Sequence, residues 1–447
     1  MKGGSSFFWM VDLMGLNLGF VSTRFAGIDG VSLEASKWAQ IFEGEGYNCH
    51  WFAGELTKST IVSLLETRAD FKYERNQWVN SQLFGNHKKS FQLSKIIRNY
   101  KSILASRLKI FIDLYKLDLL VVENALAIPM HIPLGLALTD VISATGIPAI
   151  AHHHDFYWER PRYLPLNGNK IYIHRAFPPK LPNIEHVVIN SKAQQELVRR
   201  RRIAATLIPN AMDFENPPIV DKERVKAFRS SIGIKPDDVM FLQPTRVVQR
   251  KGIEFALELI KALNHPKYKL VISHEAGDEG FEYVESINQL AARYGIQVLY
   301  VDNMVDDPFA RPSEKNGRFS LWVVYQAADF ITYPSLYEGF GNAFLEAIYF
   351  NKPMLVNRYK IFVDDIEPKG FELVKMDGVL TGEVVQKIRK IVHDKERQQT
   401  MVDKNYRVAL KHYSYSSLRK QLLQIMPNLI QPNCLPNTDR PRSALGS

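Results

Sequence analysis

The chain is poor in cysteine: its 447 residues include only two, Cys49 and Cys434. Two thiols cannot build a disulfide framework or a cysteine-based metal site, which excludes the small disulfide-rich proteins and the zinc-ribbon proteins. This cysteine usage is consistent with a reducing compartment, and we expect a cytoplasmic protein.

Long apolar runs are also missing. No stretch approaches the roughly 18 apolar residues of a membrane-spanning helix, so we expect no transmembrane segment. The apolar run Phe7-Phe8-Trp9-Met10-Val11 near the start is interrupted by Asp12, and it has neither a substantial basic region nor a small-residue cleavage site. We therefore interpret residues 1–17 as an N-terminal extension ahead of the first strand, not as a secretion signal.

Acidic residues are in the minority, because 57 Lys and Arg face 47 Asp and Glu, a net charge of +10. This excess suits an anionic partner such as nucleotide phosphates, an acidic acceptor, anionic lipid or nucleic acid, although simple solubility explains it equally well. The basic residues are spread along the chain without a recognition motif, so we expect no nucleic-acid partner.

Strand-like runs alternate with longer helical patterns, which is typical of α/β proteins with parallel sheets. A chain of this length suits two domains, and the segment Asn216-Pro217-Pro218 indicates a linker between them. Helical patterns dominate residues 56–116 and 379–411. We predict an N-terminal domain over 18–215, a C-terminal domain over 216–412, a C-terminal helix over 413–426 and a disordered tail over 427–447. The strands are expected at 18–22, 47–52, 118–122, 147–151, 186–191, 205–210, 239–243, 268–273, 298–301, 330–333 and 353–356.

Two carboxylates lie eight positions apart just after the strand expected at 330–333. Glu338 precedes the turn Gly339-Phe340-Gly341, and Glu346 lies in the apolar helical run that follows from Asn342. A strand, a glycine turn and a helix aim backbone N–H groups and the positive end of the helix dipole at an anion. Since carboxylates also accept hydrogen bonds from hydroxyl groups, this segment predicts a sugar-nucleotide site. The alternative is a helix N-terminus with one stabilising and one solvated glutamate.

A basic loop follows the strand expected at 239–243 and contains Arg246 and Lys251. A diphosphate leaving group gains negative charge as its bond to a sugar breaks, and fixed cations stabilise that transition state more than the ground state. The alternative is a solvated basic loop.

Three histidines, His152-His153-His154, end another strand. Adjacent residues on a strand point to opposite faces, so three consecutive histidines rarely converge on one ion, and we expect no metal site. The alternative to a functional role is a buried, hydrogen-bonded histidine.

Other polar residues follow strands of the N-terminal half. Gly30 opens a helix and permits close backbone approach, and Asp29 beside it is either an acceptor ligand or a helix cap. Glu123 and Asn124 end a further strand that faces the same expected cleft.

The aromatic segment 156–163 contains Tyr157 and Arg160. Aromatic rings stack on sugars and arginine binds carboxylate or phosphate through two parallel hydrogen bonds, so we expect this segment to line a site for a small, polar, anionic acceptor. The alternative is an aromatic loop packed on its own domain. Arg199 to Arg202 end a helix, where cations are favoured; a membrane-surface patch is the alternative.

As a set, these motifs resemble the retaining glycosyltransferases of family 4, also called glycosyl transferases group 1. Glu338 and Glu346 match the family's E-x7-E signature, and Arg246 and Lys251 match its basic residue and lysine–glycine pair. The resemblance spans about residues 18–425. Further matching segments are Asn190-Ser191, Ile208-Pro209-Asn210-Ala211-Met212-Asp213, in which Ala211 replaces the family's glycine, and Ala327-Ala328-Asp329. The segment from Phe20 to Glu34 is similar to enzymes that mannosylate glucosylglycerate, a compatible solute.

The resemblance implies an α/β GT-B fold, with two Rossmann-like domains facing each other across a cleft. It also implies a retaining hexosyltransferase with a nucleotide-sugar donor, GDP-mannose or UDP-glucose, and a histidine near the transferred sugar: by position His154, with His153 as the fallback. The resemblance implies that the enzyme needs no cofactor or metal. It does not decide whether a divalent metal stimulates the reaction or whether the protein forms an oligomer. The catalytic residues are then Arg246, Lys251, Glu338 and His154, and the donor-binding residues Gly30, Gly339, Phe340, Gly341, Asn342 and Glu346. The acceptor-binding residues are Asp29, Glu123, Asn124, His153, Tyr157 and Arg160.

Three other functions remain open. The acceptor can be lipid-linked and reached at a membrane surface, which the basic charge favours. A nucleotide-sugar epimerase can share the two-domain fold, and a non-catalytic sugar-nucleotide-binding protein can keep it. Neither of the last two needs both the glutamate pair and the basic pair.

Overall fold

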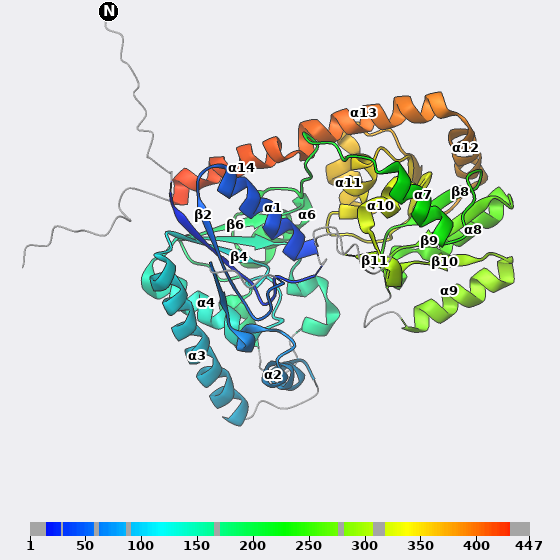
Figure 1. The fold of residues 1–447 in the computed structure, drawn as a ribbon. Helices are drawn as coiled ribbons and strands as arrows, with labels where there is room; N and C mark the ends of the chain where they lie inside the picture. The colour runs from blue at the N-terminus through cyan, green and yellow to red at the C-terminus, as the bar shows by residue number, and fades with distance from the viewer. Residues whose placement is uncertain are drawn as a thin grey trace, which may run out of the picture.

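The computed structural model describes residues 15–27, 30–57, 62–85, 91–164, 170–275, 281–306 and 318–429. Within these ranges the chain forms two α/β domains side by side, each built on its own parallel sheet (Figure 1). The expected fold of two parallel-sheet domains is confirmed. Residues 216–220, which connect the two sheets, carry neither helix nor strand. The domain boundary at 215/216 stays a prediction.

The first sheet has seven parallel strands in the order β3-β2-β1-β4-β5-β6-β7. Its central strand β4 is buried along its whole length, as expected where helices cover both faces of a parallel sheet. The strands are β1 (Asn17–Val21), β2 (Asn48–Ala53), β3 (Ser63–Leu65), β4 (Leu119–Glu123), β5 (Ala149–His153), β6 (Ile184–Val188) and β7 (Thr206–Leu207). The helices of this domain are α1 (Gly30–Gly44), α2 (Glu74–Phe84), α3 (Phe91–Tyr115), α4 (Ile132–Thr145), α5 (Lys170–Ala176) and α6 (Ser191–Arg201).

The second sheet has six parallel strands in the order β10-β9-β8-β13-β14-β15, and β11 pairs with β12 in a separate two-stranded sheet. The strands are β8 (Val239–Gln243), β9 (Tyr268–Ile272), β10 (Val298–Tyr300), β11 (Val305–Asp306), β12 (Phe319–Ser320), β13 (Phe330–Tyr333), β14 (Met354–Asn357) and β15 (Val374–Met376). The accompanying helices are α7 (Lys222–Ser231), α8 (Ile253–Leu263), α9 (Phe281–Tyr294), α10 (Leu321–Ala327), α11 (Asn342–Tyr349), α12 (Gly382–His393) and α13 (Lys395–Tyr413).

The last described helix, α14 (Tyr415–Leu429), returns to the first domain. Figure 1 shows α13 running along the second domain and α14 continuing over the first, next to α1. Its buried residues Leu418, Leu422, Ile425 and Met426 join the hydrophobic core that contains Leu18 of β1 and residues of α1 and β4. Both domains are therefore tied together twice, by the 216–220 connection and by α14.

Several local expectations need correction. The mostly helical segment 56–116 also contains β3, an edge strand that was not expected. The helical segment 379–411 is divided at Asp394 into α12 and α13. Strands β11, β12 and β15 were not expected, since each has only two or three residues. Helix α14 also continues through Pro427 to Leu429, where the tail was expected to begin; residues 430–447 lie outside the described residues.

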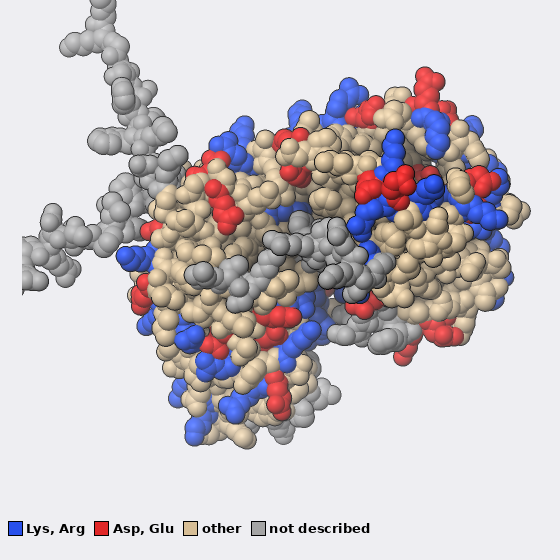
Figure 2. Space-filling model, viewed as in Figure 1, with Lys and Arg blue, Asp and Glu red and all other residues tan. Residues whose placement is uncertain are grey.

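None of the described helices combines the length and the apolar composition that a bilayer crossing requires. Figure 2 shows Lys and Arg side chains interspersed with Asp and Glu over both domains on the face in view.

Candidate active site

Glu338 lies in the turn between β13 and α11, and its carboxylate is bound by two cations from the loop after β8. Lys251 Nζ forms an ion pair with Oε1, and Arg250 Nη1 lies 3.1 Å from Oε2. Both Glu338 and Lys251 are buried. Burial favours the neutral carboxyl, but the charges of Lys251 and Arg250 outweigh it and lower the pKa of Glu338. The structure therefore keeps Glu338 ionised and brings two of the predicted catalytic residues together.

Arg246 adds a third positive charge to this loop. Its side chain is exposed, and it contributes to lowering the pKa of Lys251, after burial and the charge of Arg250. His274, which follows β9 after Ser273, is also near: burial, with the charges of Lys251 and Arg246, lowers its pKa to about 4. Two cations thus bind the Glu338 carboxylate, and Arg246 lies close enough to Lys251 to act on its pKa.

The sequence reasoning did not single out Arg250 or His274. Arg250 is the direct neighbour of Lys251, and the structure shows that its side chain reaches the same carboxylate. His274 follows a strand of the second sheet in the same way as the residues that were singled out. The signal for Arg250 was its place beside Lys251, and the signal for His274 was its place just after β9.

The turn after Glu338 can only be made by glycine. Gly341 has a φ of +113°, and a Cβ there would lie 2.6 Å from the hydroxyl oxygen of Tyr333 and 2.8 Å from that of Tyr359. A Cβ at Gly339 would lie 3.4 Å from the carbonyl oxygen of His154, in the other domain. The side chain of Phe340 is buried in the hydrophobic core, so only its backbone remains for the predicted donor contact.

Glu346 lies on α11 and has different partners from Glu338. The hydroxyl of Tyr325 donates a 2.5 Å hydrogen bond to its Oε2. Burial raises the pKa of Glu346, whereas the Tyr325 hydrogen bond and the charge of Lys37 act in the opposite direction. The two glutamates of the sequence motif therefore have opposite pKa shifts, because cations bind only Glu338 directly.

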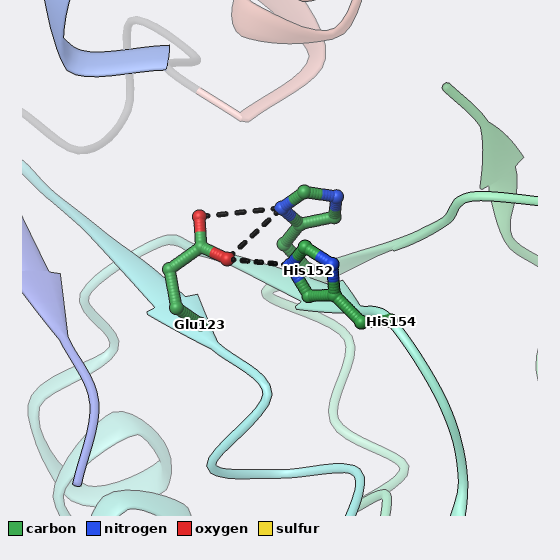
Figure 3. A group of neighbouring side chains, drawn as sticks. All are labelled: Glu123, His152 and His154. Atoms are coloured by element: carbon green, nitrogen blue, oxygen red, sulfur yellow. Dashed lines mark hydrogen bonds and ion pairs between the residues drawn. The ribbon is translucent and has the colours of Figure 1, made fainter. Parts of the chain in front are cut away.

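In the first domain, Glu123, His152 and His154 form a buried cluster at the ends of β4 and β5 (Figure 3). His152 Nδ1 lies 3.0 Å and His154 Nε2 lies 3.1 Å from Glu123 Oε2. The two histidines share a face because side chains alternate along a strand, and Glu123 is the direct neighbour of His152 in the parallel register.

Burial and mutual attraction together decide which groups of this cluster are charged. Burial opposes ionisation of Glu123, but His152 and His154 outweigh it and lower the pKa of Glu123 to about 2. Burial also opposes protonation of His154, yet the hydrogen bond and charge of Glu123 raise its pKa. For His152 burial dominates and lowers the pKa. The arrangement therefore favours a carboxylate at Glu123 with the proton on His154.

Among the residues that the structure describes, the same three form a group that could hold a metal ion. One ligand atom from each lies within 4.8 Å of the others, and two imidazoles with a carboxylate are a known ligand set for transition metals. His152 and His154, which alternate along the strand, meet on one face, and the adjacent His153 is not needed for such a ligand set.

His153 does not belong to this cluster. It points to the opposite face of β5, where its Nε2 lies 2.9 Å from Nδ1 of His186, and burial together with His186 lowers its pKa well below the usual value. Its predicted acceptor contact does not fit this placement, because strand periodicity turns it away from His152 and His154.

The other predicted acceptor residues form a neighbouring chain of contacts. Asn124 accepts a 3.2 Å hydrogen bond from the His154 amide through Oδ1 and donates a 3.0 Å hydrogen bond to Asp155 through Nδ2. Arg160 forms an ion pair with Asp155. Tyr157 is half-buried and packs within its own domain. Asp29 lies outside the described residues.

Direct hydrogen bonds join the two domains around the glycine turn. Asn190 Nδ2 donates to the carbonyl of Gly339 at 2.7 Å, and Asn210 Nδ2 donates to Asn342 Oδ1 at 2.6 Å. A Cβ at Gly30 would lie 3.6 Å from Asn342 Nδ2. The structure thus brings two predicted donor residues, Gly30 and Asn342, together from opposite domains.

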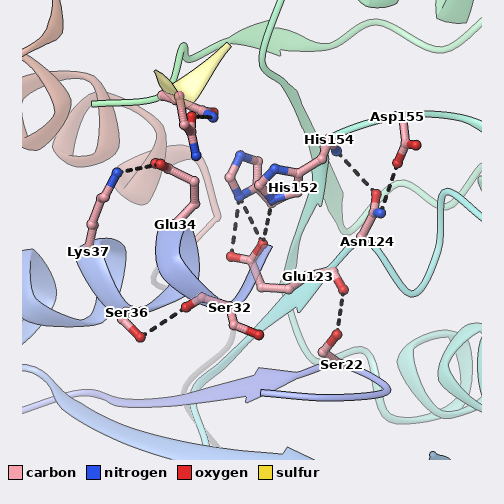
Figure 4. A network of polar contacts seen from close by, with 12 residues as sticks. Ser22, Ser32, Glu34, Ser36, Lys37, Glu123, Asn124, His152, His154 and Asp155 are labelled. Carbon is pink, nitrogen blue, oxygen red and sulfur yellow. Dashed lines mark hydrogen bonds and ion pairs between the residues drawn. The ribbon is translucent and has the colours of Figure 1, made fainter. Parts of the chain in front are cut away.

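A buried ion pair on α1 also faces this boundary (Figure 4). Lys37 Nζ lies 2.5 Å from Glu34 Oε1 and donates a 2.7 Å hydrogen bond to the carbonyl of Ala211. Glu34 Oε2 is buried without a hydrogen-bond partner among the described residues, and its charge acts on both His154 and Glu346. The sequence reasoning missed this pair, whose only signal is charge on the buried side of a helix.

Comparisons with known proteins agree with this geometry. A family model described as glycosyl transferases group 1 matches residues 311–408. The chain is 31% identical to the mannosylglucosylglycerate synthase of Thermotoga maritima over 90% of this chain and 98% of that protein. It is also 31% identical to the mannosylglucosylglycerate synthase of Petrotoga mobilis over 81% of this chain and 86% of that protein.

The fold is shared with solved structures at lower identity. A glycosyltransferase from Rickettsia africae superposes with a TM-score of 0.67 at 14% identity, over 94% of this chain and all of that one. The two parallel-sheet domains thus form a GT-B fold, as the sequence motifs implied.

Proposed function

Because the chain belongs to the glycosyl transferases group 1 family, we propose that it transfers a hexose from GDP-mannose or UDP-glucose to a small, polar, anionic acceptor such as glucosylglycerate. One observation carries this proposal: Arg250 and Lys251 bind Glu338, and Arg246 lies in the same basic loop after β8. Such a group suits a diphosphate next to a sugar. The names of the relatives from Thermotoga maritima and Petrotoga mobilis support the choice of acceptor.

The proposed reaction separates the sugar from its diphosphate before the acceptor bond is complete. The bond between the anomeric carbon and the diphosphate oxygen breaks, and Arg246 and Lys251 stabilise the negative charge that develops on that oxygen. The acceptor hydroxyl attacks from the same face and gives its proton to the departing oxygen, so the anomeric configuration is retained. This mechanism needs no protein nucleophile and no bound metal.

The remaining residues bind and orient the substrates in this proposal. The ion pair between Glu338 and Lys251 weakens when the donor binds, and Glu338 then accepts hydrogen bonds from hydroxyls of the transferred sugar. Glu346 binds the ribose. His154 donates a hydrogen bond to the sugar from the imidazolium that Glu123 stabilises. The Gly339–Gly341 turn brings backbone N–H groups near the diphosphate.

The test is to incubate the protein separately with GDP-mannose and UDP-glucose and a set of acceptors, and to identify products by mass. The set includes glucosylglycerate, neutral glucosylglycerol and a lipid-linked sugar. We expect nucleoside diphosphate to be released only when an acceptor is present, with a lower KM for glucosylglycerate than for glucosylglycerol. The anomeric coupling in the product's NMR spectrum should report retention. Conversion of the donor without any acceptor would identify an epimerase instead, and no conversion at all would indicate a binding protein.

Lys251→Ala tests the phosphate clamp. We expect kcat to fall about a hundredfold or more, as for loss of one preorganised charge at a transition state. The matched control is Lys267→Ala, since Lys267 pairs with Asp237 on the surface away from this loop. An unchanged kcat in Lys251→Ala would show that this assignment is wrong.

A further inference from the structure

A cavity of about 200 Å³ lies between the two domains, beside the glycine turn. Its walls come from the loop after β5, from α6 with the residue before it, and from Tyr337 and Ile361 of the second domain. None of the four residues proposed as catalytic is in its described lining. A single water needs only about 10–15 Å³ measured in this way, so there is room for a polyhydroxylated group. The lining includes Trp158, Glu159, Asn190, Lys192, Glu196 and Tyr337.

The charges in this interdomain cavity are unequal. Lys192 Nζ lies 5.5 Å from the ring centroid of Tyr337, and within the described ranges no carboxylate oxygen lies at ion-pair distance from it. Glu196, by contrast, is already paired with Arg199 at 2.8 Å and Arg200 at 2.5 Å. Lys192 is therefore a cation whose charge is not balanced by an ion pair.

Glu159 does not provide that balance. Its carboxylate accepts hydrogen bonds from the Tyr337 hydroxyl and, at 3.1 Å, from the Phe156 amide. Burial raises the pKa of Glu159, although these hydrogen bonds and the charge of Lys192 oppose the shift. Glu159 is thus held by Tyr337 and Phe156 and forms no ion pair with Lys192.

Trp158 leaves a hydrogen-bond donor unused. Its indole Nε1–H is buried and has no acceptor among the residues that the structure describes. An unpaired buried donor costs about 1–3 kcal/mol, so an acceptor oxygen bound here would recover that free energy. Trp158, which carries this N–H, and Lys192 both line one cavity, and their two donor groups suit the two oxygens of a carboxylate.

We propose that the interdomain cavity binds the carboxylate of a polyhydroxy acid, with Lys192 Nζ and Trp158 Nε1–H as its hydrogen-bond donors. This inference rests on the proposed function and assigns a place to the acid group of its acceptor. Trp158 and Glu159, which line this cavity, belong to the same aromatic segment as the predicted acceptor residues Tyr157 and Arg160.

The position of the cavity connects acceptor binding to the donor site. Tyr337 directly precedes Glu338, and Asn190 donates to the carbonyl of Gly339, so both lining residues adjoin the glutamate motif. Since the walls come from both domains, an occupant contacts both and stabilises their present arrangement.

Lys192→Met tests the assignment through the Michaelis constant. We expect the KM for glucosylglycerate to rise about tenfold to a hundredfold, as for loss of one hydrogen bond to a charged group, with kcat nearly unchanged. The KM for neutral glucosylglycerol should not change, and Lys192→Arg should restore most of the affinity for the acid. Trp158→Phe should raise the same KM by a smaller factor, and Lys180→Met, an exposed lysine of the same domain, is the matched control.

Equal effects of Lys192→Met on the acid and the neutral acceptor, or no effect, would overturn the inference. Binding of glucosylglycerate in the presence of GDP, measured by calorimetry, tests the cavity assignment separately from the proposed function. If no donor is turned over, yet the wild type binds the acid and Lys192→Met does not, the cavity assignment stands and the proposed function fails. If transfer occurs with an unaltered KM in Lys192→Met, the function stands and the cavity assignment fails.

Discussion

Glu123 shows two opposing effects on a single side chain. Its burial opposes the charged form, and the two histidines that it contacts favour that form strongly enough to lower its pKa to about 2. The sequence placed Glu123 and His154 at the ends of two strands facing one cleft. It did not predict that they bind each other, because residues 31 positions apart meet only through the pairing of β4 with β5.

Glu123→Gln should lower the pKa of His154, because the carboxylate is what raises it. A histidine with a raised pKa in the folded state adds stability below its unfolded pKa, and that stability is lost as the pH rises through the folded value. This part of the pH dependence should therefore disappear in the variant. NMR titration of ¹³C-labelled histidines measures the shift.

His412, which lies in α13, is the internal control for this titration and should keep its pKa. A His154 pKa that stays raised in Glu123→Gln would mean that another group supports the imidazolium, and Glu34 would then be the first residue to test.

At the scale of single elements, α14 shows how a local pattern leads to a long-range contact. Its buried residues Leu418, Leu422, Ile425 and Met426 follow helical spacing, which makes an amphipathic helix predictable from the sequence. The pattern does not say which surface this stripe covers. In the structure it covers the first domain, although α13 before it packs on the second.

Leu422→Ala should destabilise the first domain by about 2–5 kcal/mol, because Leu422 is fully buried and its truncation leaves a cavity. Hydrogen–deuterium exchange should become faster in α14 and in the adjoining β1. The matched control is Leu410→Ala on α13, whose side chain is partly exposed, and it should cost far less. Equal exchange in the two variants would contradict the packing described here.

For the whole molecule, the decisive feature is the set of hydrogen bonds between the domains. The amide of Ser191, at the start of α6, donates a 2.8 Å hydrogen bond to Asp365 Oδ2 of the second domain. A carboxylate at a helix N-terminus is favoured by the helix dipole. Together with the contacts of Asn190 and Asn210, this bond holds the sheet ends of the two domains close to each other.

Asp365→Ala should loosen this arrangement and raise the radius of gyration measured by small-angle X-ray scattering. Asp364→Ala is the control, since Asp364 pairs with Lys360 on its own domain at 2.8 Å and should leave the radius unchanged. If both variants scatter like the wild type, the Asp365 contact does not hold the domains together in solution.

Short-range patterns were sufficient for most strands, the glycine turn and the family resemblance, because each depends on residues adjacent in the chain. They were also sufficient for placing Glu338, Lys251 and His154 at strand ends, since parallel sheets gather polar groups there. The partners of these residues could not be predicted from the sequence. Lys251 with Glu338, His153 with His186 and Tyr337 with Glu159 are each brought together by strand order and domain packing. Charge compensation and burial follow from those contacts, so the pKa shifts and the interdomain cavity could not be inferred before the fold was known.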